Sequence, residues 1–351
     1  MSAANRLPAE LIDEIVSFSC ACALRRPNPD KNLHRWSGWS DLSTLWSLCL
    51  TSRQFNNIAT RHLYHCPSGD RGVATWWLLA RTLIACPDIA THVKGLYMDA
   101  FDDLGGSELP HDISTLYSSG QLVRAEGTPG EDHSWLLSRL MLGESAACLD
   151  LMTALCPNLE TLDAVLDMEL DNITFTRPQL FTFCPPKSMQ ALTSLTVSPK
   201  NTEDGMGLEE IEDLLKAAPN LTTIRCYDLK SCSDRLALTL GRVTSLDLRS
   251  SAIDDDSLAN ILCTFPNLET FAYQSGPTVY EIPFFLWDIK DILLRYALKL
   301  KTFTLDLAAD EINWGFGDGR EYCDEDWDDL KKALGQGGIA LDYEWRASRQ
   351  F

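Results

Sequence analysis

Histidine, cysteine and carboxylate groups are the residues of this chain that could do chemistry. His62, His65 and Cys66 lie close together in the sequence, and imidazole and thiolate groups are common zinc ligands. The two histidines, however, stand three apart at the end of an expected helix, with no second cysteine pair. Structural histidines are therefore the favoured interpretation, and we expect no metal site.

Two acidic runs are further candidates. The run from Asp318 to Asp329 holds seven acids but lacks the alternating ligands and central glycine of a calcium loop, so we expect a solvated loop. Asp254, Asp255 and Asp256 precede Ser257 and predict a helix N-terminus, where negative charge is stabilising. Neither run predicts a catalytic carboxylate pair.

Motifs of common enzyme classes are missing from the sequence. It holds no phosphate-binding glycine loop, dinucleotide-binding fingerprint, zinc-protease helix or hydrolase nucleophile elbow. We therefore expect no catalytic residue and no cofactor. An enzyme whose catalytic groups come together from distant segments is the third and last alternative for the function.

The charge is distributed unevenly along the 351 residues. The net charge is −20. Residues 1–66 hold seven Lys or Arg and five Asp or Glu, so they carry +2 and the remainder carries −22. A surface of that sign repels phosphate backbones, so we expect no nucleic-acid partner.

No segment of the sequence predicts secretion or membrane insertion. Acidic residues interrupt the first fourteen positions, and the most apolar later stretch, 76–86, is broken by Arg81 and is too short for a bilayer. We therefore expect a cytoplasmic or nuclear protein with no membrane partner. The twelve cysteines form no C-x-x-C pair, which favours reduced, buried thiols.

Three short amphipathic helices are predicted within the first 65 residues. In 7–18, Leu7, Leu11, Ile15 and Phe18 form one apolar face, which Ile12 and Val16 widen. A second helix places Leu42, Leu45, Trp46 and Cys49 on one face, and Thr51 or Ser52 can cap a third that contains Phe55, Ile58, Ala59 and Leu63. Helices with more apolar surface than they can hide from each other tend to need a partner.

This N-terminal segment resembles an F-box. The resemblance rests on LPAELIDEIVSF at 7–18, TLWSLCLTSRQF at 44–55 and the ending His62-Leu63-Tyr64. The chain departs from the family pattern by about twenty extra residues after the first helix, by Thr51 and by Phe55. An ordinary helical cap on a repeat domain is the alternative.

The resemblance implies docking on the Skp-family adaptor of SCF ubiquitin ligases and, through it, on a cullin. Burying a large apolar side chain is worth about 1.5–3 kcal/mol, so a small apolar patch can hold such a partner, with Leu11 and Leu45 as candidate hot spots. The expected adaptor-binding residues are Leu7, Pro8, Leu11, Ile15, Leu45, Leu48, Leu50, Ser52, Arg53 and Phe55.

Internal repeats dominate the rest of the sequence. Segments with an apolar-x-x-apolar-x-apolar frame begin at 93, 159, 192, 221, 243, 268 and 300, and three of them follow a helical run ending in Pro-Asn-Leu. Proline there stops the helix, and a short strand follows. The segment 337–345 is expected to be a final strand that covers the open end of the stack.

Together these features resemble the F-box/leucine-rich-repeat proteins of filamentous fungi. The resemblance implies an α/β fold: an irregular leucine-rich-repeat solenoid, or horseshoe, behind a small three-helix domain. The expected domains are 1–66, with an insertion near 19–40, and 67–351, with an inserted loop near 101–132.

Alternation along each strand predicts a second binding surface. The outward positions are expected to hold a protein partner, and the alternative is that they are merely solvated. They are Gly95, Tyr97, Asp99, Asp163, Arg225, Tyr227, Asp247, Arg249, Gln274 and Asp306.

The favoured function is therefore a non-catalytic, substrate-recognition subunit of an SCF-type ubiquitin ligase, with an unknown protein as its target. The alternative is a leucine-rich-repeat interaction scaffold with no ubiquitin role, in which the helices only cap the repeats.

Overall fold

The computed structural model describes residues 7–19, 42–67, 73–98, 140, 145–166, 187–201, 205–230, 236–276, 286–308 and 324–346. Over these ranges the chain is an α/β protein with one open, parallel, eight-stranded sheet. No helix among them is long and apolar enough to cross a bilayer. The insertion expected near 19–40 and the loop expected near 101–132 lie outside them, apart from Ser19.

The strands follow one another in chain order across the sheet, each parallel to the next. They are β1 (Gly95–Met98), β2 (Thr161–Leu166), β3 (Ser194–Pro199), β4 (Thr223–Tyr227), β5 (Ser245–Ser251), β6 (Thr270–Ser275), β7 (Thr302–Ala308) and β8 (Ala340–Arg346). Every repeat segment of the sequence and the closing segment are thus confirmed as strands.

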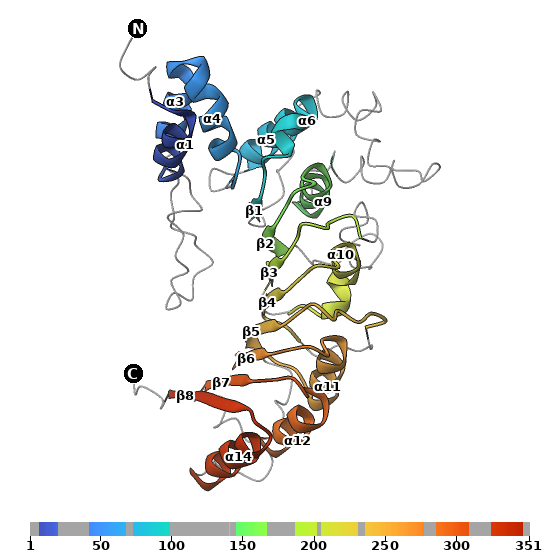
Figure 1. The fold of residues 1–351 in the computed structure, drawn as a ribbon. Helices are drawn as coiled ribbons and strands as arrows, with labels where there is room; N and C mark the ends of the chain where they lie inside the picture. Colours follow the sequence, from blue (N-terminus) through green and yellow to red (C-terminus); the bar gives the residue numbers. More distant parts are fainter. Residues whose placement is uncertain are drawn as a thin grey trace, which may run out of the picture.

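Helices cover one face of this sheet, and the other face is open. Figure 1 shows a curved body with the strands on its inner side and the helices on its outer side. The covering elements are α5 (Val73–Ala85), α6 (Pro87–Ala90), α9 (Ser145–Leu155), the 3₁₀ turn η3 (Leu208–Ile211), α10 (Glu212–Ala217), α11 (Asp255–Thr264), α12 (Leu286–Tyr296) and α14 (Asp324–Gln336). Because alternate strand side chains point toward them, the apolar positions of the frame form one continuous core.

The Pro-Asn-Leu junctions have a common structural role. The side-chain amide of each asparagine donates a hydrogen bond to a backbone carbonyl of the preceding repeat: Asn158 to Thr91 (2.9 Å), Asn220 to Gln190 (2.7 Å) and Asn267 to Gly241 (2.6 Å). The hydrogen bond of each asparagine therefore links one repeat to the repeat before it.

A second link recurs where the strands begin. Two successive N–H groups donate to one carbonyl of the preceding repeat, as from Glu160 and Thr161 to Lys94 and from Lys301 and Thr302 to Glu269. At the first strand the acceptor is the His65 carbonyl, which takes the N–H groups of Lys94 (2.8 Å) and Gly95 (3.0 Å). The residues after the N-terminal helices thus occupy the place of a preceding repeat.

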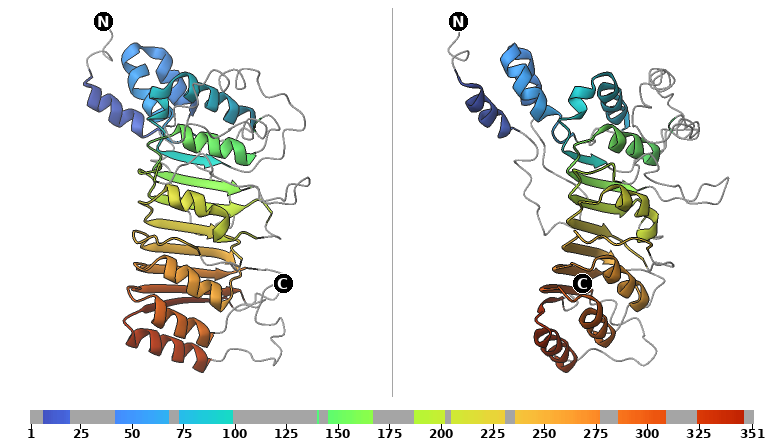
Figure 2. Two further views of the ribbon diagram at one scale, coloured as in Figure 1. Left: turned by 90° about the vertical axis from the view of Figure 1, so that its right-hand side faces the viewer. Right: turned by 45° about the vertical axis from the view of Figure 1, so that its right-hand side comes forward.

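The N-terminal helices α1 (Ala9–Ser17), α3 (Leu42–Thr51) and α4 (Arg53–Leu63) form a separate helical module. Figure 2 shows this module beyond β1, at one end of the sheet. It has its own small core, separate from the core under the sheet: Ile12, Val16, Leu45, Cys49, Ile58 and Ala59.

Two capping predictions are confirmed in the helices. Ser52 is the N-cap of α4 and accepts a hydrogen bond from the Phe55 N–H (3.3 Å). Asp254 is the N-cap of α11 and accepts from the Ser257 N–H (2.7 Å). Negative charge at the start of α11 is therefore structural.

The prediction of a solvated loop over the acidic run is wrong for its second half. Residues from Asp324 onward form α14. Trp327, Leu330 and Leu334 are buried on one side of that helix, at spacings of three and four. The acids crowd its first turns, where the helix dipole favours them, and this apolar stripe anchors the helix.

The described cysteines differ from the expectation at one position. Six have free thiols, and burial raises the pKa of Cys148 and of Cys156 to about 12, so both stay protonated. Cys66 is instead disulfide-bonded. The prediction of reduced cysteines is therefore wrong for Cys66. The prediction rested on the spacing of the cysteines in the sequence, and that spacing does not indicate a disulfide at Cys66.

Candidate protein-binding surfaces

The first candidate surface is an apolar stripe on α1. Leu11, Ile15 and Phe18 are 47%, 56% and 69% exposed, and Leu7 extends the stripe. Ile12 and Val16, on the neighbouring flank of the same helix, are fully buried. The sequence placed all six on one broad apolar face, and the structure divides that face into a packed side and an open side.

Polar contacts at two points hold α1 in this orientation against α4. The Asp13 carboxylate lies 2.9 Å from His62 Nε2, and the Gln54 amide donates to the Leu7 carbonyl (3.4 Å). With Ile12 and Val16 packed toward Ile58, these contacts leave the apolar stripe facing outward.

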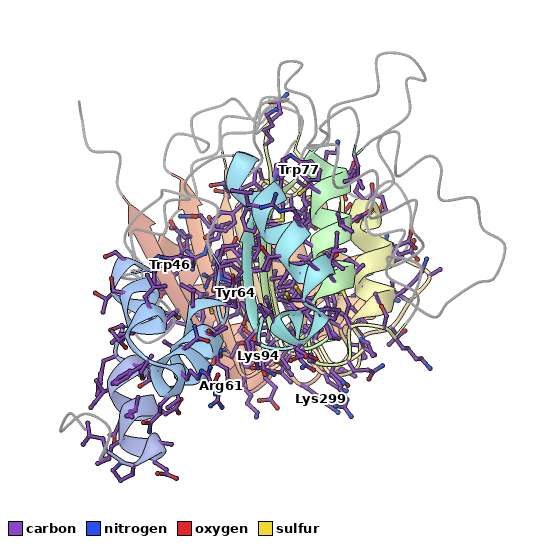
Figure 3. All side chains as sticks on the ribbon, turned by 90° about the horizontal axis from the view of Figure 1, so that it is seen from above. Trp46, Arg61, Tyr64, Trp77, Lys94 and Lys299 are labelled. Atoms are coloured by element: carbon purple, nitrogen blue, oxygen red, sulfur yellow. The ribbon has the colours of Figure 1, made fainter. Side chains whose placement is uncertain are left out.

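Two more large apolar side chains stand open on α3. Trp46 and Leu50, one helical turn apart, are 57% and 72% exposed. Figure 3, seen from above, labels Trp46 and Arg61 in the blue helical module. Phe18 and Trp46 were not among the predicted adaptor-binding residues, although both are large apolar residues of the segments that carry the F-box resemblance.

The predicted adaptor-binding residues fall into three groups. Leu7, Pro8, Leu11, Ile15, Leu50 and Arg53 are exposed, and Ser52, Leu48 and Phe55 are half-buried. Leu45 has no exposed surface, because it is in the core between α3 and the other helices. Leu45 therefore supports the module from within and cannot be a contact residue in this conformation.

The second candidate surface is the open side of the sheet, which we name the sheet face. Strand register aligns one outward row across β1 to β5: Tyr97, Asp163, Thr196, Arg225 and Asp247. Tyr227 and Arg249 are partners in the next row. Asp99, which was predicted to belong to this surface, lies outside the described residues.

An ionic cluster occupies the centre of the sheet face. Asp247 accepts hydrogen bonds from Arg225 Nε (2.8 Å) and from Arg249 Nε (2.5 Å). Its side chain is only 11% exposed, whereas those of the arginines are 42% and 36% exposed. The structure thus brings together three of the predicted residues that the sequence could only place on a common face.

The cluster shifts the pKa values of Tyr227 and of Arg225. Burial raises the pKa of Tyr227, and Asp247 and Asp163 raise it further, against the lowering by the arginines. Burial alone would lower the pKa of Arg225, but Asp247 and Tyr227 hold it above its ordinary value. At neutral pH the tyrosine therefore keeps its proton and the arginine its charge.

A second polar pair lies farther along the sheet face. Gln274 donates from Nε2 to the Asp306 carboxylate (2.8 Å), and the two residues face each other on β6 and β7. Tyr97 and Asp163 are half-buried at the β1 end. The sheet face is therefore polar along the strands, with its arginines gathered on β4 and β5.

The structure gives the histidine and cysteine trio other roles. His62 meets Asp13, the His65 carbonyl accepts the N–H groups of β1, and Cys66 is in a disulfide. Burial lowers the pKa of His65, and the nearby His62 lowers it further. In the part of the chain that the structure describes, no group of three or more His, Cys, Asp or Glu is placed to hold a metal.

The chain has no counterpart in two comparisons with known proteins. No protein-family model matches it, and no curated protein matches it.

Proposed function

We propose that this protein is a non-catalytic substrate-recognition subunit of an SCF-type ubiquitin ligase that acts in the cytoplasm or nucleus. In this proposal α1, α3 and α4 are an F-box that docks on the Skp-family adaptor and, through it, on a cullin. The stack of strands and helices is a leucine-rich-repeat solenoid, and its sheet face holds the target protein.

The open apolar stripe of α1 is the observation that carries the proposal. Leu11 and Ile15 are about half exposed, and Phe18 more so, on a helix whose other flank is packed into a core. Contiguous exposed apolar surface on a folded domain marks an interaction site. The stripe falls within the segment that resembles an F-box, and it lies at the end of a sheet with a polar outward face.

A pull-down with a purified Skp-family adaptor tests the proposal. We expect the wild-type chain to be retained and the Leu11→Asp/Ile15→Asp variant to be lost, because both charges would have to be buried on docking. The matched control, Leu78→Asp/Leu298→Asp, replaces two leucines that are also exposed, at 51% and 82%, but lie outside the module. It should be retained like the wild type.

Two results would contradict this function. One is that the adaptor fails to retain the wild-type chain. The other is that it retains the Leu11→Asp/Ile15→Asp variant as well as the control, while circular dichroism shows all three chains folded.

The alternative of an interaction scaffold without a ubiquitin role has its own supporting observation. The His65 carbonyl bonds to Lys94 and Gly95 as a preceding repeat would, so the residues after α4 cap the sheet. If capping were the only role of this N-terminal segment, deleting residues 1–66, which include His65, should unfold the strands and helices that follow or lower their melting temperature. Under the ligase proposal the same deletion abolishes adaptor binding.

A further inference from the structure

The central cluster of the sheet face has two arginines, Arg225 and Arg249, for the one carboxylate that both contact, that of Asp247. One guanidinium is enough to neutralise the Asp247 carboxylate, yet both Arg225 and Arg249 donate to it. Over β1 to β7, as far as the structure describes them, these two are the only basic side chains at outward strand positions. The cluster therefore carries a surplus positive charge in a chain of net charge −20.

The surplus charge is presented with donors to spare. A guanidinium has five N–H donors, and each arginine gives its Nε donor to Asp247. The side chains are 42% and 36% exposed, so a partner can reach the outer edge of both groups. These are the donors that recognise carboxylate and phosphate oxygens in pairs.

The cluster is also held in place before any partner arrives. Asp247 orients both guanidinium groups, and the Tyr227 hydroxyl accepts a further hydrogen bond from Arg225. A side chain that is already ordered loses less conformational freedom on binding, which favours affinity. The arrangement suits an anion that accepts hydrogen bonds from the outer N–H groups of both guanidinium groups.

Carboxylates on either side limit the kind of anion that fits. Asp163 is on β2, two strands from Arg225, and Asp306 is on β7, two strands from Arg249. Neighbouring strands are about 4.8 Å apart, so the backbone of each acid lies roughly 10 Å from that of the arginine. The Asp163 carboxylate is near enough to raise the pKa of Tyr227, so it borders the cluster on the β2 side. A long acidic run laid across the strands would meet these charges, whereas one acidic group would not.

We propose that Arg225 and Arg249 bind a single acidic side chain, from a segment of a protein partner that is otherwise neutral. The acidic group is a carboxylate or a phosphoryl group, which share the same acceptor chemistry. The inference rests on the proposed function only in taking the sheet face as the partner-binding surface, and it needs no adaptor.

The inference can be tested by measuring, with fluorescence anisotropy, how tightly pools of short degenerate peptides bind to the full-length chain. Four pools share neutral flanks and differ at the centre, which is serine, glutamate, phosphoserine or a run of glutamates. We expect the glutamate pool, the phosphoserine pool or both to bind more tightly than the serine pool and the glutamate run. Their ratio identifies the preferred oxyanion.

Charge-neutral variants locate the site. Replacing one arginine, in Arg225→Gln or Arg249→Gln, should weaken acidic-pool binding about tenfold or more, since a hydrogen bond to a charged group is worth at least the 1.4 kcal/mol that corresponds to tenfold. The matched controls, Arg242→Gln and Arg295→Gln, remove exposed arginines from outside the sheet face and should bind like the wild type.

Variants of Asp247 separate a loss of binding from a loss of folding. The Arg225→Gln/Asp247→Asn/Arg249→Gln variant leaves no buried charge without a partner and should fold but not bind. Asp247→Asn alone keeps both arginines and an amide oxygen that can still accept a hydrogen bond from one of them, so it should fold and still bind the acidic pools. Equal binding of all four pools overturns the inference, as does a folded triple variant that still binds or a folded Asp247→Asn variant that does not.

The outcome is independent of the adaptor experiment. Peptide binding without adaptor binding would leave the sheet-face site standing and remove the ligase proposal. Adaptor binding without selectivity among the pools would do the reverse.

Discussion

The two flanks of α1 should respond in opposite ways to the same kind of truncation. Leu11→Ala/Ile15→Ala removes side chains from the open stripe, whereas Ile12→Ala/Val16→Ala removes side chains with no exposed surface. We expect the first variant to lose adaptor affinity and keep its stability. The second should lose the stability of the helical module.

The expected sizes follow from the exposure of each side chain. Full burial of a large aliphatic side chain is worth about 1.5–3 kcal/mol, and Leu11 and Ile15 have about half of their surface left to bury. Docking therefore gains about 0.75–1.5 kcal/mol from each, or roughly a 10- to 150-fold change in Kd for the pair. Ile12→Ala alone should destabilise the module by about 2–5 kcal/mol, because it leaves a cavity in a small core.

Two measurements separate these effects. Calorimetric titration with a Skp-family adaptor gives the affinity, and hydrogen exchange over residues 42–63 gives the stability of the module. Faster exchange is expected only for Ile12→Ala/Val16→Ala. The reasoning is refuted if Leu11→Ala/Ile15→Ala binds as tightly as the wild type, or if it exchanges as fast as the other variant.

Two further predictions concern the sheet. Tyr273→Phe removes a buried hydroxyl that donates to the Ser251 carbonyl (2.7 Å), so we expect a loss of about 1–2 kcal/mol in urea unfolding, and no change would mean that water replaces the bond. The pKa of His65 is lowered in the folded chain by burial first, so as the pH falls below its ordinary pKa of 6.5 the unfolded chain takes up a proton before the folded chain does. The contribution of His65 to stability should therefore be lost as the pH falls below about 6.5, and thermal melts of His65→Gln should show a smaller fall over this range than those of the wild type.

The strands were predictable because each repeat carries its own local instructions. In LCPNLETL at 155–162, proline ends the helix, Asn158 reaches back to the preceding repeat and Leu159 begins the buried frame. The same chemistry recurs at Asn220 and Asn267. Because these signals are local, they predict where each strand begins and which of its side chains point inward.

Which flank of a helix packs was not predictable in the same way. Apolar residues cover more than half of the circumference of α1, so periodicity alone cannot choose between Leu11 and Ile12 as the buried position. The choice depends on α4, whose Ile58 packs in the same core and whose His62 meets Asp13. Leu45 was assigned to the surface for the same reason, because the side of α3 that faces α4 is set by tertiary contacts.

The centre of the sheet face lies between these cases. Alternation placed Arg225, Asp247 and Arg249 outward, as the structure has them. Their contact requires β4 and β5 to pair in one register, with Arg225 opposite Asp247. A sequence pattern thus identified the members of the cluster but not the contact between them.

The hydrogen bonds to the His65 carbonyl have a geometric consequence. They extend the ladder of the strands one step beyond β1, to the residues that directly follow α4. If one protein bound to α1 and another bound to the strands, these hydrogen bonds would hold the two binding surfaces at a fixed angle, because no flexible linker separates α4 from the sheet. Under the proposed ligase function, the angle between the helical module and the sheet would decide which lysine of the target protein comes within range of the enzyme that modifies it.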